Sequence, residues 1–124
     1  MKTISVVTVS FNAASTIRDT IESVLAQDYE EVEYIVVVGE SEDGTLDIVN
    51  EYRERIDTII SEPDRGIYDA MQKGIDVAKG DVVAFINSDD FYANEGVISE
   101  VMSSFQDPGI GIVFGDLCYV ARVN

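Results

Sequence analysis

Apolar positions along the chain follow two spacings, and the two alternate. Continuous or near-continuous runs of β-branched residues predict buried strands at residues 4–9, 33–38, 58–61, 81–86 and 110–114. Apolar residues three and four positions apart predict a helix capped near Ser15 and further helices at residues 45–55, 67–78 and 95–105. Polar, glycine- and proline-containing loops separate these elements.

The order of the elements predicts the fold class. Strands joined by connections long enough for crossovers become parallel neighbours, so we expect an α/β fold with a mainly parallel sheet and helices on both faces. Ligands of such sheets bind beyond the carboxyl ends of the strands. The loops of interest are therefore residues 10–14, 39–44, 62–66 and 87–92. The length of 124 residues predicts a single domain.

Composition excludes several functions. Acids outnumber bases 24 to 8, a net charge of −16, so binding to nucleic acid is disfavoured. The chain has no histidine, which removes the usual general base and the commonest zinc ligand. The longest apolar run is far shorter than a membrane helix, and the single Cys118 is typical of a reduced compartment. We therefore expect a soluble, cytoplasmic protein without a membrane span.

The adjacent Asp89 and Asp90 are the sharpest chemical feature. They follow a buried strand, where two carboxylates could hold a hard cation against the phosphates of a ligand. The sequence Asn-Ser-Asp-Asp at residues 87–90 is equally typical of an ordinary turn. Arg65 is the one strong cationic candidate in the loops at this edge. A bound diphosphate would consequently need a metal ion to offset its charge.

The other loops carry weaker signals. Arg65 could pair with a phosphate, or with Asp64 or Asp69 as a solvated loop residue. The segment 40–45 favours a turn followed by a helix cap, and Phe11 could meet a planar base or belong to the core. Neither a G-x-G-x-x-G fingerprint nor a P-loop is present.

Several segments together resemble family 2 glycosyltransferases, which have the GT-A fold and transfer sugar from a nucleotide-sugar. In chain order the segments are ISVVTVSFN at 4–12, SVLAQ at 23–27, DGT at 43–45, SEPDRGIYDAM at 61–71, KG at 73–74 and GDVVAFINSDD at 80–90. The sequences EPDRGIYDAM at 62–71 and NSDD at 87–90 are similar to those of enzymes that build bacterial cell-surface polysaccharides. The resemblance implies the Rossmann-like nucleotide-binding half of a GT-A fold.

The resemblance also implies roles for individual residues. The residues expected to bind the nucleotide-sugar are Val9, Ser10, Phe11 and Asn12 at the end of the first strand, and Glu40, Arg65 and Asp89 in later loops. Asp90, with Asp89, would ligate Mn²⁺ or Mg²⁺ on the diphosphate of the donor, for which a UDP-sugar is expected. Transfer would invert the anomeric centre and use an acceptor hydroxyl, in surface polysaccharide synthesis. A membrane-associated acceptor and an oligomer both stay open.

The chain departs from the family pattern in two places. Aspartates usually end the second strand, but Val38 and Gly39 occupy those positions, and Glu40 is the nearest carboxylate. The family's catalytic base and acceptor-binding elements follow the donor-binding half. We therefore expect the base beyond Asn124, in an acceptor-binding half that these residues lack. The alternative is a non-catalytic nucleotide-binding or assembly module derived from a glycosyltransferase.

Overall fold

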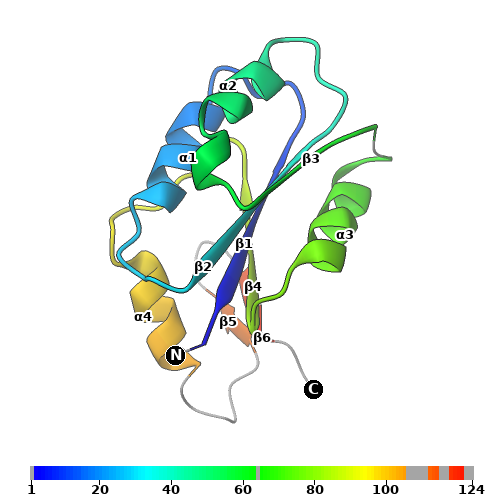
Figure 1. Cartoon of the computed structure of the whole chain (residues 1–124). Coiled ribbons are helices and arrows are strands. Elements are labelled where there is room, and N and C mark those ends of the chain that lie inside the picture. The colour runs from blue at the N-terminus through cyan, green and yellow to red at the C-terminus, as the bar shows by residue number, and fades with distance from the viewer. Residues whose placement is uncertain (1, 64, 106–111, 115–117, 122–124) are drawn as a thin grey trace.

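The computed structural model describes residues 2–63, 65–105, 112–114 and 118–121 (Figure 1). In chain order its elements are β1 (Ile4–Ser10), α1 (Ile17–Leu25), β2 (Val32–Val38), α2 (Thr45–Glu51), the 3-10 helix η1 (Arg53–Arg55), β3 (Thr58–Ser61), α3 (Ile67–Val77), β4 (Val82–Asn87), α4 (Val97–Ser104), β5 (Ile112–Phe114) and β6 (Cys118–Ala121). Strands and helices alternate through α4, as the apolar spacing predicts.

The sheet has the strand order β3-β2-β1-β4-β6-β5. β1 pairs in parallel with both β2 and β4, and β2 pairs in parallel with β3. Ser10 lies opposite Val38, Val9 opposite Asn87, and Val38 opposite Ser61. The four parallel strands therefore end together at one edge. The mainly parallel α/β sheet predicted from the sequence is confirmed.

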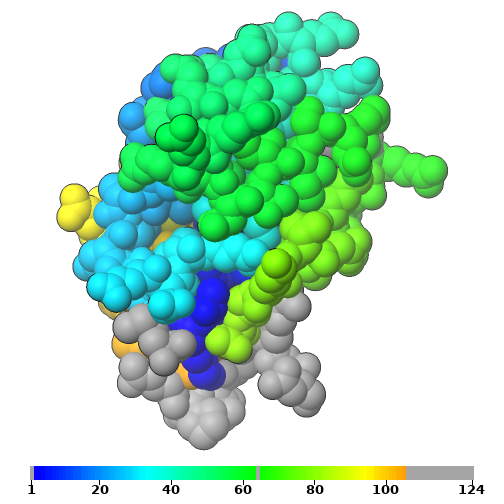
Figure 2. All heavy atoms as spheres, viewed as in Figure 1, coloured from blue at the N-terminus to red at the C-terminus, as the bar shows by residue number. Residues whose placement is uncertain are grey.

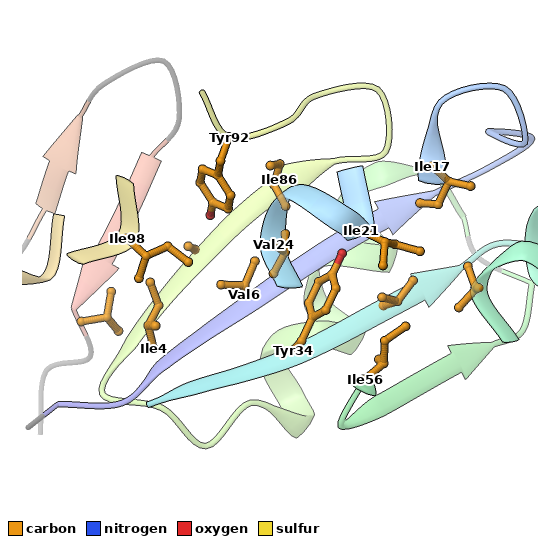
Figure 3. Packing of buried hydrophobic residues seen from close by; sticks show 14 of the residues in the cluster. Ile4, Val6, Ile17, Ile21, Val24, Tyr34, Ile56, Ile86, Tyr92 and Ile98 are labelled. Carbon is orange, nitrogen blue, oxygen red and sulfur yellow. The ribbon is translucent and has the colours of Figure 1, made fainter. Parts of the chain in front are cut away.

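Helices cover both faces of the sheet. α1, α2 and α4 lie on one face and α3 lies on the other (Figure 1). The larger core lies between the sheet and the helices α1, α2 and α4, and Tyr34 of β2 points toward Ile21 and Val24 of α1 (Figure 3). The smaller core lies under α3 and contains Val7, Val9, Ile35, Val37, Ala70, Ala78 and Val83. Alternating side chains of each strand thus feed two cores.

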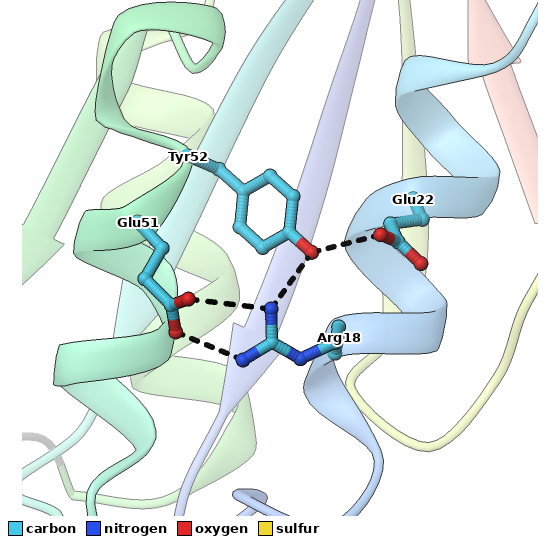
Figure 4. Close-up of polar contacts among 4 residues, drawn as sticks. All are labelled: Arg18, Glu22, Glu51 and Tyr52. Atoms are coloured by element: carbon cyan, nitrogen blue, oxygen red, sulfur yellow. Dashed lines mark hydrogen bonds and ion pairs between the residues drawn. The ribbon is translucent and has the colours of Figure 1, made fainter.

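Two polar side chains of the larger core bond each other. Thr8 Oγ1 and Tyr34 Oη lie 2.8 Å apart within the larger core, and burial raises the pKa of the Tyr34 phenol. On the surface, Arg18 joins α1 to α2. Its guanidinium donates to Glu51 Oε2 at 2.9 Å and to Tyr52 Oη at 3.1 Å (Figure 4). The two helices are thereby joined beside the first and second strands.

Several predicted boundaries change. The helix expected over residues 45–55 is interrupted, because α2 ends at Glu51 and η1 follows it. Thr16, next to Ser15, takes the position before α1 as expected, but its side chain makes no capping hydrogen bond. Lys79 and Gly80 have the sequence pattern of a helix end, with a cation in the last turn and a glycine beyond it, but α3 already stops at Val77. Gly80 packs against the β1 backbone, where a Cβ would lie 2.7 Å from the Ser5 nitrogen.

Strand β6 is not predicted from the sequence, in which the last expected strand covers residues 110–114. Of these, residues 110 and 111 lie outside the described residues, as do Pro108 and Gly109, which are typical of a turn before that strand. β6 instead pairs antiparallel with β4, and β5 pairs antiparallel with β6. A run as short as Cys118–Ala121 carries no clear period, so a strand there could be recognised only from the open edge of β4 that it covers.

Candidate functional site

A pocket of about 720 Å³ opens at the edge where the parallel strands end. The ends of β1 and β4, the segment before α1 and the beginning of α3 line it. The lining residues are Val9, Ser10, Phe11, Asn12, Ala13, Ser15, Thr16, Gly66, Ile67, Ala70, Asn87, Ser88 and Asp89. The pocket thus lies where parallel α/β sheets commonly bind ligands.

The segment after β1 presents an aromatic ring to this pocket. Phe11 is 64% exposed, which is unusual for a phenylalanine beside a buried strand. Asn12 follows with φ 48°, a left-handed conformation that asparagine tolerates better than most residues. The Asn12 amide donates to Ser41 Oγ at 3.0 Å, and Asn12 Oδ1 accepts from the Glu42 amide at 3.1 Å. These bonds fix the backbone that carries Phe11.

The loop after β2 braces the same segment. Asp43 Oδ2 accepts from the Ala14 amide at 3.1 Å, and Thr45 Oγ1 accepts from the Ala13 amide at 2.8 Å. Asp43 Oδ1 also accepts from the Thr45 hydroxyl and amide, at 2.5 and 3.1 Å. These donors, led by the Thr45 hydroxyl, hold the pKa of the Asp43 carboxyl below its usual value. The side-chain cap predicted for this helix is not found, because Gly44 takes the N-cap position of α2 and no side chain caps it. Asp43 instead accepts from the amides of Thr45 and Ala14 and so holds the wall of the pocket.

Asn87, Ser88, Asp89 and Asp90 form a turn directly after β4. The Asp90 amide donates to the Asn87 carbonyl at 3.0 Å, which closes the turn. Asp89 lies in the pocket wall, and both aspartates are exposed. The turn interpretation is therefore confirmed, and it is compatible with the metal-binding interpretation. The turn uses the main chain of Asp90 and leaves its carboxylate at the surface.

The loop between β3 and α3 forms the opposite rim and projects from the molecule at the right of Figure 2. The Arg65 amide donates to Asp69 Oδ2 at 2.9 Å, and this bond is the main cause of the lowered pKa of Asp69. Lys73 Nζ donates to the Pro63 carbonyl at 2.6 Å and lies 3.2 Å from Glu62 Oε1 and 3.6 Å from Asp69 Oδ2. Lys73 therefore joins the loop to α3, and its positive charge is already paired with the carboxylates of Glu62 and Asp69.

The structure brings most of the predicted site residues together. Val9, Ser10, Phe11, Asn12 and Asp89 line the pocket. The remaining three, Glu40, Arg65 and Asp90, are exposed residues of neighbouring loops and lie outside its lining.

The loops expected from the sequence include Gly66, in residues 62–66, but not the pocket residues that belong to the start of α3. Ile67 and Ala70 enter the pocket because α3 begins at this edge. Gly66 has φ 117°, a conformation that favours glycine, and this turn starts the helix beside the pocket. The glycine before an apolar helical stripe was the signal available in the sequence.

The donor atoms at this edge fit Mn²⁺ or Mg²⁺ only together with a ligand. Within the residues that the structure describes, no group of three acidic or cysteine side chains is arranged to hold a metal ion. Asp89 and Asp90 supply two exposed carboxylates, and Mg²⁺ commonly takes one or two carboxylates plus phosphate oxygens. The residues present therefore fit a cation shared with a bound diphosphate.

Comparisons with known proteins identify the family. The family model described as Glycosyl transferase family 2 matches residues 5–121. TuaG of Bacillus subtilis, which its name assigns to teichuronic acid biosynthesis, is 42% identical over 90 residues, which are 70% of this chain and 36% of TuaG. WfaP of Escherichia coli, named as a UDP-Glc:alpha-D-GlcNAc-diphosphoundecaprenol beta-1,3-glucosyltransferase, is 31% identical over 102 residues, which are 82% of this chain and 41% of WfaP. The chain spans less than half the length of these relatives.

Solved structures share the fold. A mannosyltransferase from Pyrobaculum calidifontis, in complex with GDP-Man and Mn²⁺, aligns with a TM-score of 0.89 and 19% identity over 98% of this chain and 45% of that one. Glucosyl-3-phosphoglycerate synthase from Mycobacterium tuberculosis, in complex with Mn²⁺, UDP and glucosyl-3-phosphoglycerate, aligns with a TM-score of 0.59 and 29% identity over 70% of this chain and 33% of that one.

In the described part of this chain, no helix is long and apolar enough to cross a membrane.

Proposed function

Because the chain belongs to glycosyl transferase family 2, we propose that it binds a nucleoside-diphosphate sugar at the pocket and presents it for inverting transfer to an acceptor hydroxyl. The observation that carries the proposal is the placement of Asp89 in the pocket wall, with Asp90 beside it and the exposed Phe11 on the same lining. The names of TuaG and WfaP support a role in surface polysaccharide synthesis with a UDP-sugar as donor.

The two walls of the pocket would contact different parts of the donor. Phe11 offers a ring face to the nucleotide base, and Val9, Ser10 and Asn12 shape the backbone around it. Asp89 and Asp90 lie at the other wall, where the diphosphate would meet them through Mn²⁺ or Mg²⁺. When bound, the cation neutralises charge that develops on the departing nucleoside diphosphate. Arg65 stands on the rim with a full positive charge and would approach the nucleotide from there.

Calorimetry with UDP and GDP, each with and without Mn²⁺, tests the proposal. We expect Mn²⁺-dependent binding of one of the two, and a loss of about tenfold or more in affinity for Asp90→Asn, because the variant loses a charged ligand to the cation. Asp76→Asn is the matched control, since Asp76 is an exposed aspartate near the far end of α3. If neither nucleotide binds, or Asp90→Asn behaves like Asp76→Asn, the proposal is wrong.

Glu40 is the carboxylate closest in the sequence to the end of β2, and we assign it to contact with the nucleotide base. Val38 at the end of β2 is 1% exposed and so offers no polar group there, whereas Glu40 is exposed two residues later. We expect Glu40→Gln to weaken UDP binding by a few-fold, in line with the loss of one charge-assisted hydrogen bond. Unchanged affinity would instead leave the base without a carboxylate partner from this loop.

The apolar end of β2 also favours a second candidate, a nucleotide-binding module that does not transfer sugar. Neither candidate assigns a general base within residues 1–124, and a base is needed to activate an acceptor hydroxyl. We therefore expect the chain by itself to bind the donor and to show little transfer. Measuring release of the nucleoside diphosphate by the chain with a lipid-linked sugar acceptor tests this expectation, because robust release would exclude the non-catalytic module and would show that a base is supplied within these residues or by an oligomer partner.

A further inference from the structure

We propose that Thr20 is a positioning residue for the acidic turn, and that its hydroxyl sets the affinity of the site for the metal–nucleotide pair. The inference rests on the proposed function, since it concerns the turn that carries Asp89 and Asp90. Thr20 lies on α1, far from this turn in the sequence, and is 1% exposed. None of its properties in the sequence marks it as part of a site.

The hydroxyl of Thr20 joins two carbonyl groups of the turn. Thr20 Oγ1 lies 2.5 Å from the Asp90 carbonyl oxygen and 3.0 Å from the Ser88 carbonyl oxygen. Both carbonyls are acceptors, so the hydroxyl is the donor and shares its single proton between them. Because the carbonyls on either side of Asp89 converge on one atom, the hydroxyl defines how the backbone passes through Asp89.

Thr20 begins a row of polar side chains that continues this contact. Ser23 Oγ accepts from the Tyr92 amide at 3.1 Å. Gln27, just beyond α1, donates from Nε2 to the Asn94 carbonyl at 2.7 Å and accepts at Oε1 from the Ile98 amide at 2.9 Å. Thr20 and Ser23 are three positions apart on α1 and so face the same side of the helix, and Gln27 continues the row just beyond the end of α1. The segment from Ser88 to the first residues of α4 is thus bound to α1 through its main chain.

This row explains a motif that the proposed function leaves unused. The segment SVLAQ at 23–27 is part of the family resemblance, yet none of its side chains lines the pocket. Val24 packs in the core, while Ser23 and Gln27 bind the backbone that follows the acidic turn. The motif therefore supports the site from behind, and Thr20 is the member of the row nearest to the aspartates.

The energetic argument distinguishes positioning from simple stability. Loss of the hydroxyl leaves two carbonyls without this donor, at a cost similar to that of any buried hydrogen bond. The Asp89 and Asp90 carboxylates must however converge on one small cation, which tolerates little displacement of its ligands. A freed turn should therefore lose metal-dependent affinity beyond what its loss of stability explains.

The experiment compares three variants of the full chain. Thr20→Val removes the hydroxyl and keeps the shape, and Thr20→Ser keeps the hydroxyl. Thr8→Val is the matched control, because the Thr8 hydroxyl is equally buried in the same core and bonds only Tyr34 among the described residues. Each variant is measured for its free energy of unfolding in urea and for its affinity for UDP with Mn²⁺. Amide hydrogen exchange at Asp90 and Tyr92, without ligand, reports the anchoring itself.

We expect Thr20→Val to bind UDP–Mn²⁺ about tenfold more weakly, and Thr20→Ser and Thr8→Val to stay within about twofold of the parent. The Asp90 and Tyr92 amides should exchange faster in Thr20→Val alone. Parent-like affinity of Thr20→Val overturns the inference and leaves the proposed function standing, as does equal weakening of Thr20→Val and Thr8→Val. If the parent binds GDP rather than UDP, the variants are compared with GDP, and absence of binding of both nucleotides by the parent overturns both the inference and the proposed function. If Thr20→Val does not fold, Ser23→Ala is judged by the same criteria.

Discussion

Gly74 sets how closely α3 can approach the sheet, and replacing it tests the packing that places the start of α3 at the pocket. Gly74 is buried in the middle of α3. A Cβ added there would lie 2.4 Å from Val7 Cγ1 and 3.2 Å from Val7 Cγ2. Val7 is fully buried in β1, so its side chain has no free space to enter. Gly74→Ala must therefore displace the helix or the valine.

The size of the effect follows from opposing contributions. Overpacking a core by a methyl group costs about 1–3 kcal/mol, and the 2.4 Å approach to Val7 Cγ1 places this case in the upper part of that range, at about 2–3 kcal/mol. The better helix propensity of alanine returns about 1 kcal/mol, so we expect a net loss of about 1–2 kcal/mol. Val7→Ala alone should cost about 2 kcal/mol by removing two buried methyl groups. In the double variant both Val7 Cγ atoms are gone, and the Cβ of residue 7 lies 3.4 Å from the new methyl group, which is an ordinary contact. The double variant should then be no less stable than Val7→Ala.

Urea denaturation of the parent, both single variants and the double variant measures this coupling. Independent effects would add to a loss of about 3–4 kcal/mol, whereas relief of the clash predicts a coupling energy of about 2 kcal/mol. Gly74→Ala should also weaken UDP binding, because a displaced α3 carries Ile67 and Ala70 away from the pocket. Additivity within about 0.5 kcal/mol would refute the reasoning, since it would mean that Val7 and Gly74 do not restrict each other.

Three further perturbations have defined outcomes. Gly80→Ala should destabilise the chain by about 2 kcal/mol or more in urea, without rescue by truncating a side chain, because its Cβ would meet backbone atoms of β1. The pKa of Asp43 is lowered from 3.8, so the stability it contributes is present above that value and is lost as pH falls through the lowered folded pKa. Asp43→Asn should therefore flatten the acid limb of the urea midpoint measured against pH, and a limb unchanged from the parent would contradict this. Lys73→Met should speed proteolysis at residues 62–66 with little change in global unfolding, because it frees the Pro63 carbonyl.

The sequence predicts the parallel strands well because their apolar runs are long and uninterrupted. β1 and β2 are buried almost throughout, and a run of β-branched residues has few other stable placements. The antiparallel strand β6 depends on the free edge of β4, which is a property of the assembled sheet. Likewise Gly80 looks like a helix end in the sequence, and only the close approach to Ser5 reveals its packing role.

The candidate site likewise contains residues that the sequence predicts and residues that only the folded chain reveals. Phe11 and Asp89 could be identified because they directly follow strands whose carboxyl ends must meet at one edge. Thr20 could not, because a threonine at an inward helical position is indistinguishable from an ordinary core residue until Ser88 and Asp90 are placed beside it. Long-range hydrogen bonds from side chain to backbone leave no periodic trace in a sequence, so supporting residues are the last to be recognised.

The charge of the chain explains why the acidic turn fits a cation better than it fits a phosphate directly. With 24 acids against 8 bases, the average field around the molecule repels a diphosphate. The lysine nearest the β3–α3 rim, Lys73, already lies between Glu62 and Asp69, so its charge is locally compensated. Arg65 adds one positive charge against the two of Asp89 and Asp90. A divalent cation reverses the sign of the field at this single point, and for that reason nucleotide binding should depend far more steeply on Mn²⁺ than on any one basic side chain.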